Sequence, residues 1–545
     1  MPILHFRGKS YVRNHHLTVK YHELVPQADK SNTDCVSLKD NLIIHGDNLK
    51  AMKALLPLYA GQVQCVYIDP PYNRGKENWV YNDNVNAPML KEWLGKVVDK
   101  DDLTRHDKWL CMMMPRLTLL RELLAEEGVI FVSIDDNEQH HLRLLMDEVF
   151  GEQNFIANII WQKKFSPQND ANYFSDMHDF IVCYAKNKVE GEVKQGWIRN
   201  LLPRSEEMDS RYSNPDNDPR GLWTSGDLSV KTYSAEYDYP ITTPSGRVVS
   251  PPKGSCWRVP KNKFNELVSD HRIWFGVKGN SVPRIKRFLH EVQDGMVPGT
   301  IWLHEEVGHN QDAKQELKTV FSESSEPFET PKPVSLIEHI LRIATNPGDL
   351  VLDSFAGSGT TGHAVLKMNH DMEQGEEPRR FILVEMEDYA DTITAERIQR
   401  VIHGVPDAND PQLEEGLGGT FSYFELGDPI EMEAILQGDQ LPSYEDLARY
   451  VFYTATGEEF RPEGIDEVRH FIGESTDYEV YLLYQPDMEY LKTTALNLEV
   501  AEALGHPTNK KRLVFAPMKF LDQEHLHKYR IEFSQLPFEI YRYEG

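Results

Sequence analysis

At 545 residues the chain is too long for a single compact core, so several domains are expected. Its 40% hydrophobic and 26% charged residues are ordinary for a globular protein, and we expect neither a membrane-spanning helix nor a signal peptide. Five cysteines without a C-x-x-C pair argue against a disulfide framework or a cysteine-rich zinc site, so we expect a protein of the reducing cytoplasm.

The net charge of −28 is unevenly distributed along the chain. Residues 407–489 carry 21 Asp and Glu against 3 Lys and Arg, which favours a solvated surface or a protein–protein face. Residues 253–294 carry 9 Lys and Arg against 4 Asp and Glu, a balance of +5. Because phosphate binding depends on the local field, this basic stretch can bind DNA on an acidic protein, although a chance fluctuation is the alternative.

The first third of the chain alternates between predicted strands and helices. Residues 1–40 are polar and aperiodic, and we interpret them as an N-terminal arm. The apolar periodicity then predicts, in order, strand 41–45, helix 48–58, strand 63–68, helix 109–127, strand 128–134 and helix 140–150. This alternation implies an α/β fold with a doubly wound, mostly parallel sheet.

The alternation stops near residue 188 and returns near residue 333. Residues 189–325 are rich in Pro, Gly, Asp, Ser and Trp, which is typical of an inserted domain. A helix after Pro333, a strand at 350–352, a helix to about 368 and a strand at 381–384 follow. The predicted domains are therefore an arm at 1–40, two halves of one α/β domain at 41–188 and 326–405, an insertion at 189–325 and a C-terminal domain at 406–545.

A Gly-rich loop lies between the predicted strand 350–352 and the next helix. Residues 357–362 fit the pattern G-x-G-x-x-G, in which glycines let a ligand approach the backbone and a helix N-terminus favours an anionic group. A carboxylate at the tip of the following strand can bind ribose hydroxyls. The alternative reading of the glycines is that they only allow the strand and the helix to pack closely. The predicted cofactor residues here are Asp353, Phe355, Gly357, Gly359, Thr360 and Glu385.

The most specific motif is Asp69-Pro70-Pro71-Tyr72, directly after the predicted strand 63–68. An aromatic amine is a poor nucleophile, and two acceptors that bind its hydrogens free the nitrogen lone pair. Asp69 and the carbonyl of Pro70 can supply those acceptors, while Pro71 biases Pro70 toward an extended backbone. Tyr72 offers a ring to a base that has left its duplex stack. The alternative is a Pro-rich turn.

These motifs resemble the amino-methyltransferases of the β group, over residues from about 41 to 405. In that family the catalytic motif, target-recognition domain and cofactor motif follow one another in this order. The resemblance implies a class I methyltransferase-like fold, S-adenosyl-L-methionine as methyl donor, and adenine as target, because Asp69 opens the catalytic motif. It also implies that Lys332, in Thr330-Pro331-Lys332-Pro333, helps to hold the methionine end of the cofactor. Asp47 can contact the cofactor adenine or simply cap a helix, and both readings stay open.

A finer resemblance is to the Mod subunits of type III restriction–modification systems. It is carried by His45-Gly46-Asp47-Asn48-Leu49, by residues 161–166 (Trp-Gln-Lys-Lys-Phe-Ser) and by residues 448–460. The resemblance implies a homodimer and a separate helicase–nuclease subunit. The chain has no G-x-x-x-x-G-K-[ST] motif, so any ATP motor would lie on another chain.

Residues 189–325 are expected to read double-stranded DNA, through phosphate contacts that set the register and base-edge contacts that specify the sequence. The candidate DNA-binding residues are Trp257, Arg258, Lys261, Lys263, Arg284, Lys286 and Arg287. No metal site is predicted, because His304 and His309 are five residues apart and Gly308 weakens a helix between them.

The sequence therefore predicts a site-specific DNA adenine methyltransferase. One rival is a nicotinamide-dependent oxidoreductase built on the Gly-rich loop, which leaves Asp69-Pro70-Pro71-Tyr72 unexplained. The other is a non-catalytic DNA-recognition subunit, against which the intact Asp69 and Tyr72 argue.

Overall fold

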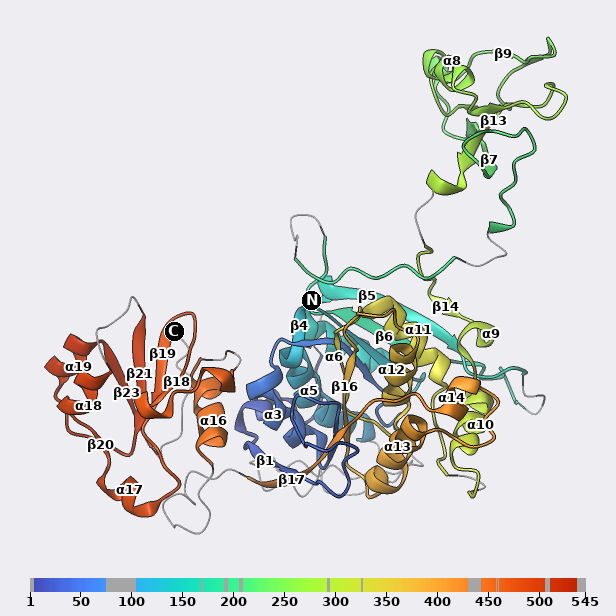
Figure 1. Cartoon of the computed structure of the whole chain (residues 1–545). Helices are drawn as coiled ribbons and strands as arrows, with labels where there is room; N and C mark the ends of the chain where they lie inside the picture. Colours follow the sequence, from blue (N-terminus) through green and yellow to red (C-terminus); the bar gives the residue numbers. More distant parts are fainter. Residues whose placement is uncertain are drawn as a thin grey trace. The chain divides into compact units, whose positions relative to one another are not determined.

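The computed structural model divides the chain into two compact units, Met1–Arg199 with Gly299–Gly545, and Asn200–Pro298 (Figure 1). The residues that it describes are 4–74, 104–167, 169, 171–190, 195–204, 209–291, 295–324, 327–429, 443–456, 458, 460–504 and 510–536. Within these ranges no helix is both long enough and apolar enough to cross a membrane.

The first unit contains a ten-stranded sheet with the order β1-β17-β2-β16-β15-β3-β4-β6-β5-β14. Its strands are β1 (His22–Pro26), β17 (Ser422–Pro429), β2 (Leu42–His45), β16 (Arg380–Glu385), β15 (Leu350–Asp353), β3 (Val63–Ile68), β4 (Leu124–Ile134), β6 (His178–Ala185), β5 (Phe155–Gln162) and β14 (Ile301–Trp302). The six strands from β17 to β4 are mutually parallel. The predicted α/β, mostly parallel sheet is confirmed.

Helices cover both faces of this sheet (Figure 1). On one face, α3 (Asn48–Tyr59), α5 (Arg105–Leu123) and α6 (Gln139–Met146) share a buried core with alternate strand residues such as Leu42 and Ile44. On the other face, α12 (Thr360–His370) packs against β16, between α11 (Val334–Ala344) and α13 (Glu396–His403). Each fully buried Leu or Ile contributes roughly 1.5–3 kcal/mol, so both faces are held by apolar burial.

One predicted helix ends earlier than its sequence pattern suggests. The apolar residues from Trp109 continue with helical spacing to residue 127, but α5 ends at Leu123 and β4 begins at Leu124. The reason is tertiary: Leu124 pairs with Val63 of β3, so the sheet recruits residues that a lone helix would keep.

The two ends of the chain also contribute regular structure to the first unit. In the predicted arm, α1 (Lys9–Val12) and α2 (His15–Thr18) precede β1, which pairs antiparallel with β17 at the sheet edge. A second sheet follows α16 (Tyr444–Thr456), with the order β18-β19-β21-β23. Its elements are β18 (Phe471–Glu474), β19 (Tyr478–Leu482), α17 (Met488–Thr493), α18 (Leu498–Ala503), β21 (Lys511–Ala516), α19 (Gln523–Tyr529) and β23 (Ile531–Gln535).

The second unit, Asn200–Pro298, lies inside the predicted insertion 189–325. A small sheet of β12 (Ile273–Trp274), β13 (Arg284–Phe288) and β7 (Trp223–Asp227) accompanies α8 (Lys261–Ser269) around a core of its own. Residues 299–320, which include β14, α9 (His304–Val307) and α10 (Asn310–Val320), belong to the first unit. The domain boundaries given above stay predictions.

Candidate active site

Four loops that the sequence analysis singled out meet at one edge of the large sheet. The strands β3 and β15 are parallel neighbours, with Val66 opposite Leu352, so the loops after Ile68 and Asp353 leave the sheet together. The next strands, β16 and β2, are also parallel, with Glu385 opposite His45. Parallel neighbours place their carboxyl ends on the same edge, where ligands bind in open α/β sheets. The sheet order therefore brings the catalytic loop and the Gly-rich loop together.

Asp69 lies at the meeting point of the two loops. Its Oδ2 forms an ion pair with Lys332, which comes from the segment before α11. Its Oδ1 is buried and has no hydrogen-bond partner among the described residues. The Lys332 Nζ also lies 5.3 Å from the ring centroid of Tyr72. One lysine therefore links the cofactor half of the fold to the catalytic motif.

Tyr72 lies beside Asp69, and the residue as a whole is half-buried. Its hydroxyl is buried, and burial raises the pKa of Tyr72 well above its ordinary value, with the charge and the hydrogen-bonding contact of Asp69 adding to the shift. The guanidinium of Arg74 lies 5.1 Å from its ring centroid. Tyr72 is therefore a neutral phenol whose ring borders the site. Desolvation at such a site strengthens any polar contact that a ligand makes with Asp69.

The catalytic loop is fixed by contacts that the sequence analysis did not predict. The indole Nε1 of Trp109 donates to the carbonyl of Pro71 at 2.7 Å. Asn73 adopts the left-handed backbone region, with φ 58°, and its side-chain amide donates to the fully buried Glu138. Asparagine tolerates this backbone region better than most residues, and the buried Asn73–Glu138 contact holds the turn in place.

Glu138 also contacts two histidines. The Nδ1 atoms of His106 and His141 lie 2.6 Å and 2.8 Å from its carboxylate oxygens. The three possible ligand atoms lie within 4.8 Å of one another, a spacing that a metal ion can use. The absence of a metal site stays a prediction for this chain. His309, in contrast, caps α10, where its Nδ1 accepts from the Asp312 backbone.

The Gly-rich loop has the backbone that its glycines permit. Gly357 and Gly359 have φ of 53° and 77°, in the left-handed region. Gly362 serves packing, because a Cβ there would lie 2.7 Å from Ile398 and 3.0 Å from Leu383. The packing role is therefore shown at Gly362, and close approach of a ligand to Gly357 and Gly359 stays a prediction.

Buried groups behind the Gly-rich loop hold its shape. Arg397 is fully buried and donates to the hydroxyls of Ser358 and Thr360 at 3.0 Å and 2.8 Å. The Thr394 hydroxyl donates to the carbonyl of Gly357 at 2.6 Å. Arg397 was missed from the sequence, because an arginine at helical spacing in α13 is ordinarily a surface residue.

Two carboxyl groups flank this loop. Asp353 accepts from the Thr361 hydroxyl at 2.6 Å and from the Phe355 backbone at 3.0 Å, and burial raises its pKa to about 7. Glu385 accepts from the backbone of Gly357 at 2.7 Å, and burial raises its pKa. Both groups thus order the loop backbone. Whether they also contact a cofactor stays a prediction.

Asp47 acts as a helix cap in this structure. Its Oδ1 accepts from the backbone N–H groups of Leu49 and Lys50 at 3.0 Å and 3.2 Å, at the start of α3. The next residue, Asn48, donates to the carbonyl of Ser354 at 2.8 Å and accepts from Arg116. The capping role is confirmed, and a cofactor contact by Asp47 stays a prediction.

The candidate DNA-binding residues of the second unit differ in accessibility. The side chains of Arg258, Lys261, Lys263, Arg284 and Arg287 are exposed. Lys263 and Arg284 form ion pairs with Glu266 and Asp227. The prediction is wrong for Trp257, which is fully buried and donates to the carbonyl of Tyr239, because a core residue cannot meet a base.

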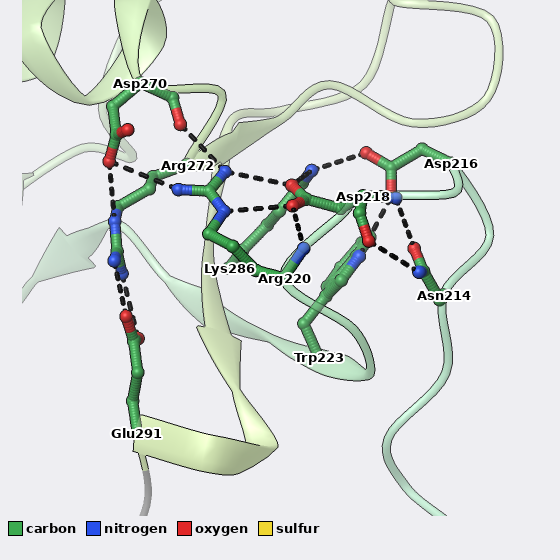
Figure 2. Close-up of polar contacts among 9 residues, drawn as sticks. All are labelled: Asn214, Asp216, Asp218, Arg220, Trp223, Asp270, Arg272, Lys286 and Glu291. Atoms are coloured by element: carbon green, nitrogen blue, oxygen red, sulfur yellow. Dashed lines mark hydrogen bonds and ion pairs between the residues drawn. The ribbon is translucent and has the colours of Figure 1, made fainter.

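The prediction is also wrong for Lys286, which is buried in an ion-pair network (Figure 2). Its Nζ contacts Asp216 and lies 2.8 Å from Asp218. Arg220 binds the same Asp218 through two hydrogen bonds of 2.9 Å. The charge of Lys286 is paired with carboxylates inside the unit and is not available to a phosphate. The Arg220 guanidinium holds the pKa of Asp218 well below its usual range.

Comparison with known proteins agrees with this geometry. Residues 63–396 match the DNA methylase family. The StyLTI Mod subunit of the type III restriction–modification enzyme of Salmonella typhimurium is 32% identical, over 83% of this chain and 70% of that protein. The EcoPI Mod subunit of Escherichia phage P1 is 33% identical, over 71% of this chain and 63% of that protein. The KpnI type II methyltransferase of Klebsiella pneumoniae is 28% identical, over 59% and 76%. The chain thus belongs to the DNA methylase family and, within it, to the Mod subunits of type III restriction–modification enzymes.

Proposed function

We propose that this DNA methyltransferase transfers a methyl group to the exocyclic amino group of adenine at a specific DNA site. The observation that carries the proposal is the position of Asp69, whose buried Oδ1 has no hydrogen-bond partner within the described ranges, beside the ring of Tyr72 where the loops after β3 and β15 meet. The alternative function of a nicotinamide-dependent oxidoreductase does not explain the presence of Asp69 and Tyr72 at this position. A non-catalytic subunit would not need a desolvated acceptor.

The residues around the Gly-rich loop fit S-adenosyl-L-methionine. Gly357 and Gly359 open the backbone at the N-terminus of α12, and the acidic side chains of Asp353 and Glu385 stand at the ends of β15 and β16. We propose that Glu385 holds the ribose, and that Phe355, Thr360, Asp47 and Lys332 complete the site. When bound, the cofactor supplies an electrophilic methyl group.

The reaction needs an amino nitrogen with a free lone pair. We propose that Asp69 Oδ1 and the carbonyl of Pro70 accept the two amino hydrogens, which localises the lone pair on the nitrogen. Trp109 engages the neighbouring carbonyl of Pro71, so the loop holds its acceptors at fixed positions. Tyr72 stacks on the base, and the burial of Asp69 Oδ1 strengthens the contacts that this atom makes.

The second unit is the proposed DNA reader. Its exposed cations are Arg258, Lys261, Lys263, Arg284 and Arg287. Phosphate contacts by such groups make binding salt-dependent. Because the type III relatives are named as Mod subunits of restriction–modification enzymes, we also propose a homodimer that works with a separate helicase–nuclease subunit.

Sequencing of genomic DNA from a host that expresses this chain, with detection of modified bases, tests the proposal. We expect N6-methyladenine at one short sequence context. N4-methylcytosine in its place would contradict the choice of base, and unmodified DNA from cells that hold folded protein would contradict the activity.

A further inference from the structure

The loop between β5 and β6 leaves the sheet at the edge that carries the candidate active site. The strand β5 is antiparallel to β6, and β6 is antiparallel to β4, so β5 runs parallel to β4 and β3. Its carboxyl end at Gln162 therefore lies on the same edge as Asp69. Residues 163–177 form the connection to β6.

The base of this loop is tied to the catalytic loop by buried charges. Lys163 lies 2.7 Å from both Asp176 and Asp179, and its side chain is almost fully buried. Arg74, two residues after Tyr72, reaches Asp179 at 4.0 Å and stands over the Tyr72 ring. A displacement of the catalytic loop would disturb this network of charges. The positions of the two loops are therefore coupled.

Two neighbouring aromatic side chains on this loop are nearly fully exposed. Tyr173 and Phe174 are 94% and 96% exposed, the highest values among the large hydrophobic side chains that the structure describes. An aromatic side chain can bury 150–250 Å² on binding, so leaving both in water forgoes a large apolar gain. Exposed apolar groups of this kind mark contact surfaces.

We propose that Tyr173 and Phe174 stack on bases of the DNA duplex beside the target adenine and support the helix when that base leaves it. This inference rests on the proposed function. Extrusion of a base leaves a gap in the stack, and aromatic side chains that insert between bases are a known means of filling such a gap. The aromatic pair belongs to the loop whose base shares Asp179 with the catalytic loop, on the edge that an extruded base must reach.

The charge of the loop agrees with DNA as its occupant. Residues 163–178 contain two lysines and two aspartates, so the loop is neutral on a chain of net charge −28. A neutral aromatic tip meets less repulsion from phosphates than the acidic remainder of the protein does. Stacking on bases needs no sequence-specific hydrogen bond, so this contact can serve any recognition sequence.

The test compares the double variant Tyr173→Ala/Phe174→Ala with the full-length wild type. Phe520→Ala is the matched control, because Phe520 is 73% exposed in the C-terminal part of the chain. Two duplexes carry the methylation site mapped by modified-base sequencing. In one duplex the target adenine is paired with thymine, and in the other it faces an abasic position, which lowers the cost of extrusion.

We expect the double variant to methylate the paired duplex about tenfold more slowly than the wild type, and the abasic duplex at a rate close to that of the wild type. With 2-aminopurine in place of the target adenine, we expect a smaller rise of fluorescence on binding. Phe520→Ala should behave as the wild type in both assays. The double variant Tyr173→Trp/Phe174→Trp should methylate the paired duplex at a rate close to that of the wild type.

A double variant with the wild-type rate on the paired duplex would overturn the inference and leave the pair as a surface for a protein partner. An equal loss on both duplexes would also overturn it. A wild type that methylates no DNA would instead refute the proposed function, so the two failures are distinguishable.

Discussion

At the scale of single residues, the chemistry of the site depends on which oxygen atoms of Asp69 already have a hydrogen-bond partner. Asp69 gives one oxygen to Lys332 and keeps the other buried and unpartnered within the described residues. A buried acceptor without a partner costs roughly 1–3 kcal/mol of folding stability. We infer that an amino hydrogen of a ligand bonds to this oxygen and so offsets the cost. A buried acceptor that is satisfied only when a ligand binds is the expected signature of a binding position.

Glu138 is a positioning residue, and its replacement tests that role. In Glu138→Gln one acceptor becomes a donor that faces the amide of Asn73 and the rings of His106 and His141. We expect kcat to fall about tenfold or more, with little change in the KM for the cofactor, because the Asn73 turn loses its anchor. Steady-state kinetics measure this split, and the exposed Glu305→Gln is the control. A variant whose kcat equals that of the wild type would show that Glu138 does not position the catalytic loop.

Asp353 makes the stability of the fold depend on pH. Burial raises the pKa of its carboxyl to about 7, above the value of about 3.9 for an unfolded Asp. The folded protein therefore binds this proton more tightly than the unfolded chain. The contribution of Asp353 to stability is complete below about pH 4 and is lost as the pH rises through about 7.

Denaturant unfolding of wild type and Asp353→Asn between about pH 5 and pH 8 measures this effect. We expect the free energy of unfolding of the wild type, relative to that of the variant, to decline across this window. Parallel pH profiles for the two proteins would show that the carboxyl titrates normally in the folded state.

At the scale of elements, the packing of α12 between β16 and α13 sets how closely the Gly-rich loop can follow the sheet. A Cβ at Gly362 would lie 2.7 Å from Ile398 and 3.0 Å from Leu383. We expect Gly362→Ala to lower the stability by about 1–3 kcal/mol through overpacking. Gly464→Ala is the control, because a Cβ there would meet nothing within 4 Å. Thermal melts of both variants measure the difference, and equal melting temperatures would contradict the packing role.

The elements that build the site were largely predictable from the sequence. The strands β3 and β15 are buried apolar runs that end in polar loops, so their bounds follow from local pattern. The end of α5 was not predictable, because Leu124 joins the sheet only through its pairing with Val63. Local periodicity contains no record of that distant partner.

The support of the site was less predictable than its motifs. Asn73 contacts Glu138 across 65 residues, Glu138 contacts His106 across 32, and Arg397 contacts His363 across 34, so no short pattern marks them. In the second unit the basic count suggested that Lys286 meets DNA, but composition does not say which cations are paired inside the fold. A count of charged residues predicts the local electrostatic field. Only the structure shows which of those charges lie on the surface and which are buried in the core.

At the scale of the whole molecule, the second unit has a stability of its own that depends on Lys286. Replacing this buried lysine removes one charged partner from Asp218, which keeps Arg220, and from Asp216, which keeps Trp223 (Figure 2). We expect Lys286→Ala to destabilise this unit by about 1.5–3 kcal/mol. The exposed Lys261→Ala should instead leave the fold intact and reduce the salt dependence of DNA binding. Limited proteolysis and salt-titrated gel shifts separate the two effects, and resistance of Lys286→Ala to protease would contradict the first.

We infer that the loop of Asp69 performs amino methylation on DNA. Transfer of a tritiated methyl group from S-adenosyl-L-methionine to unmodified host DNA tests it most directly, with Asp69→Ala beside the wild type and the exposed Asp29→Ala as control. We expect the wild type and Asp29→Ala to label adenine, and Asp69→Ala to lose about 100-fold or more of that rate while it still binds DNA in a gel shift. Full activity in folded Asp69→Ala would contradict the account.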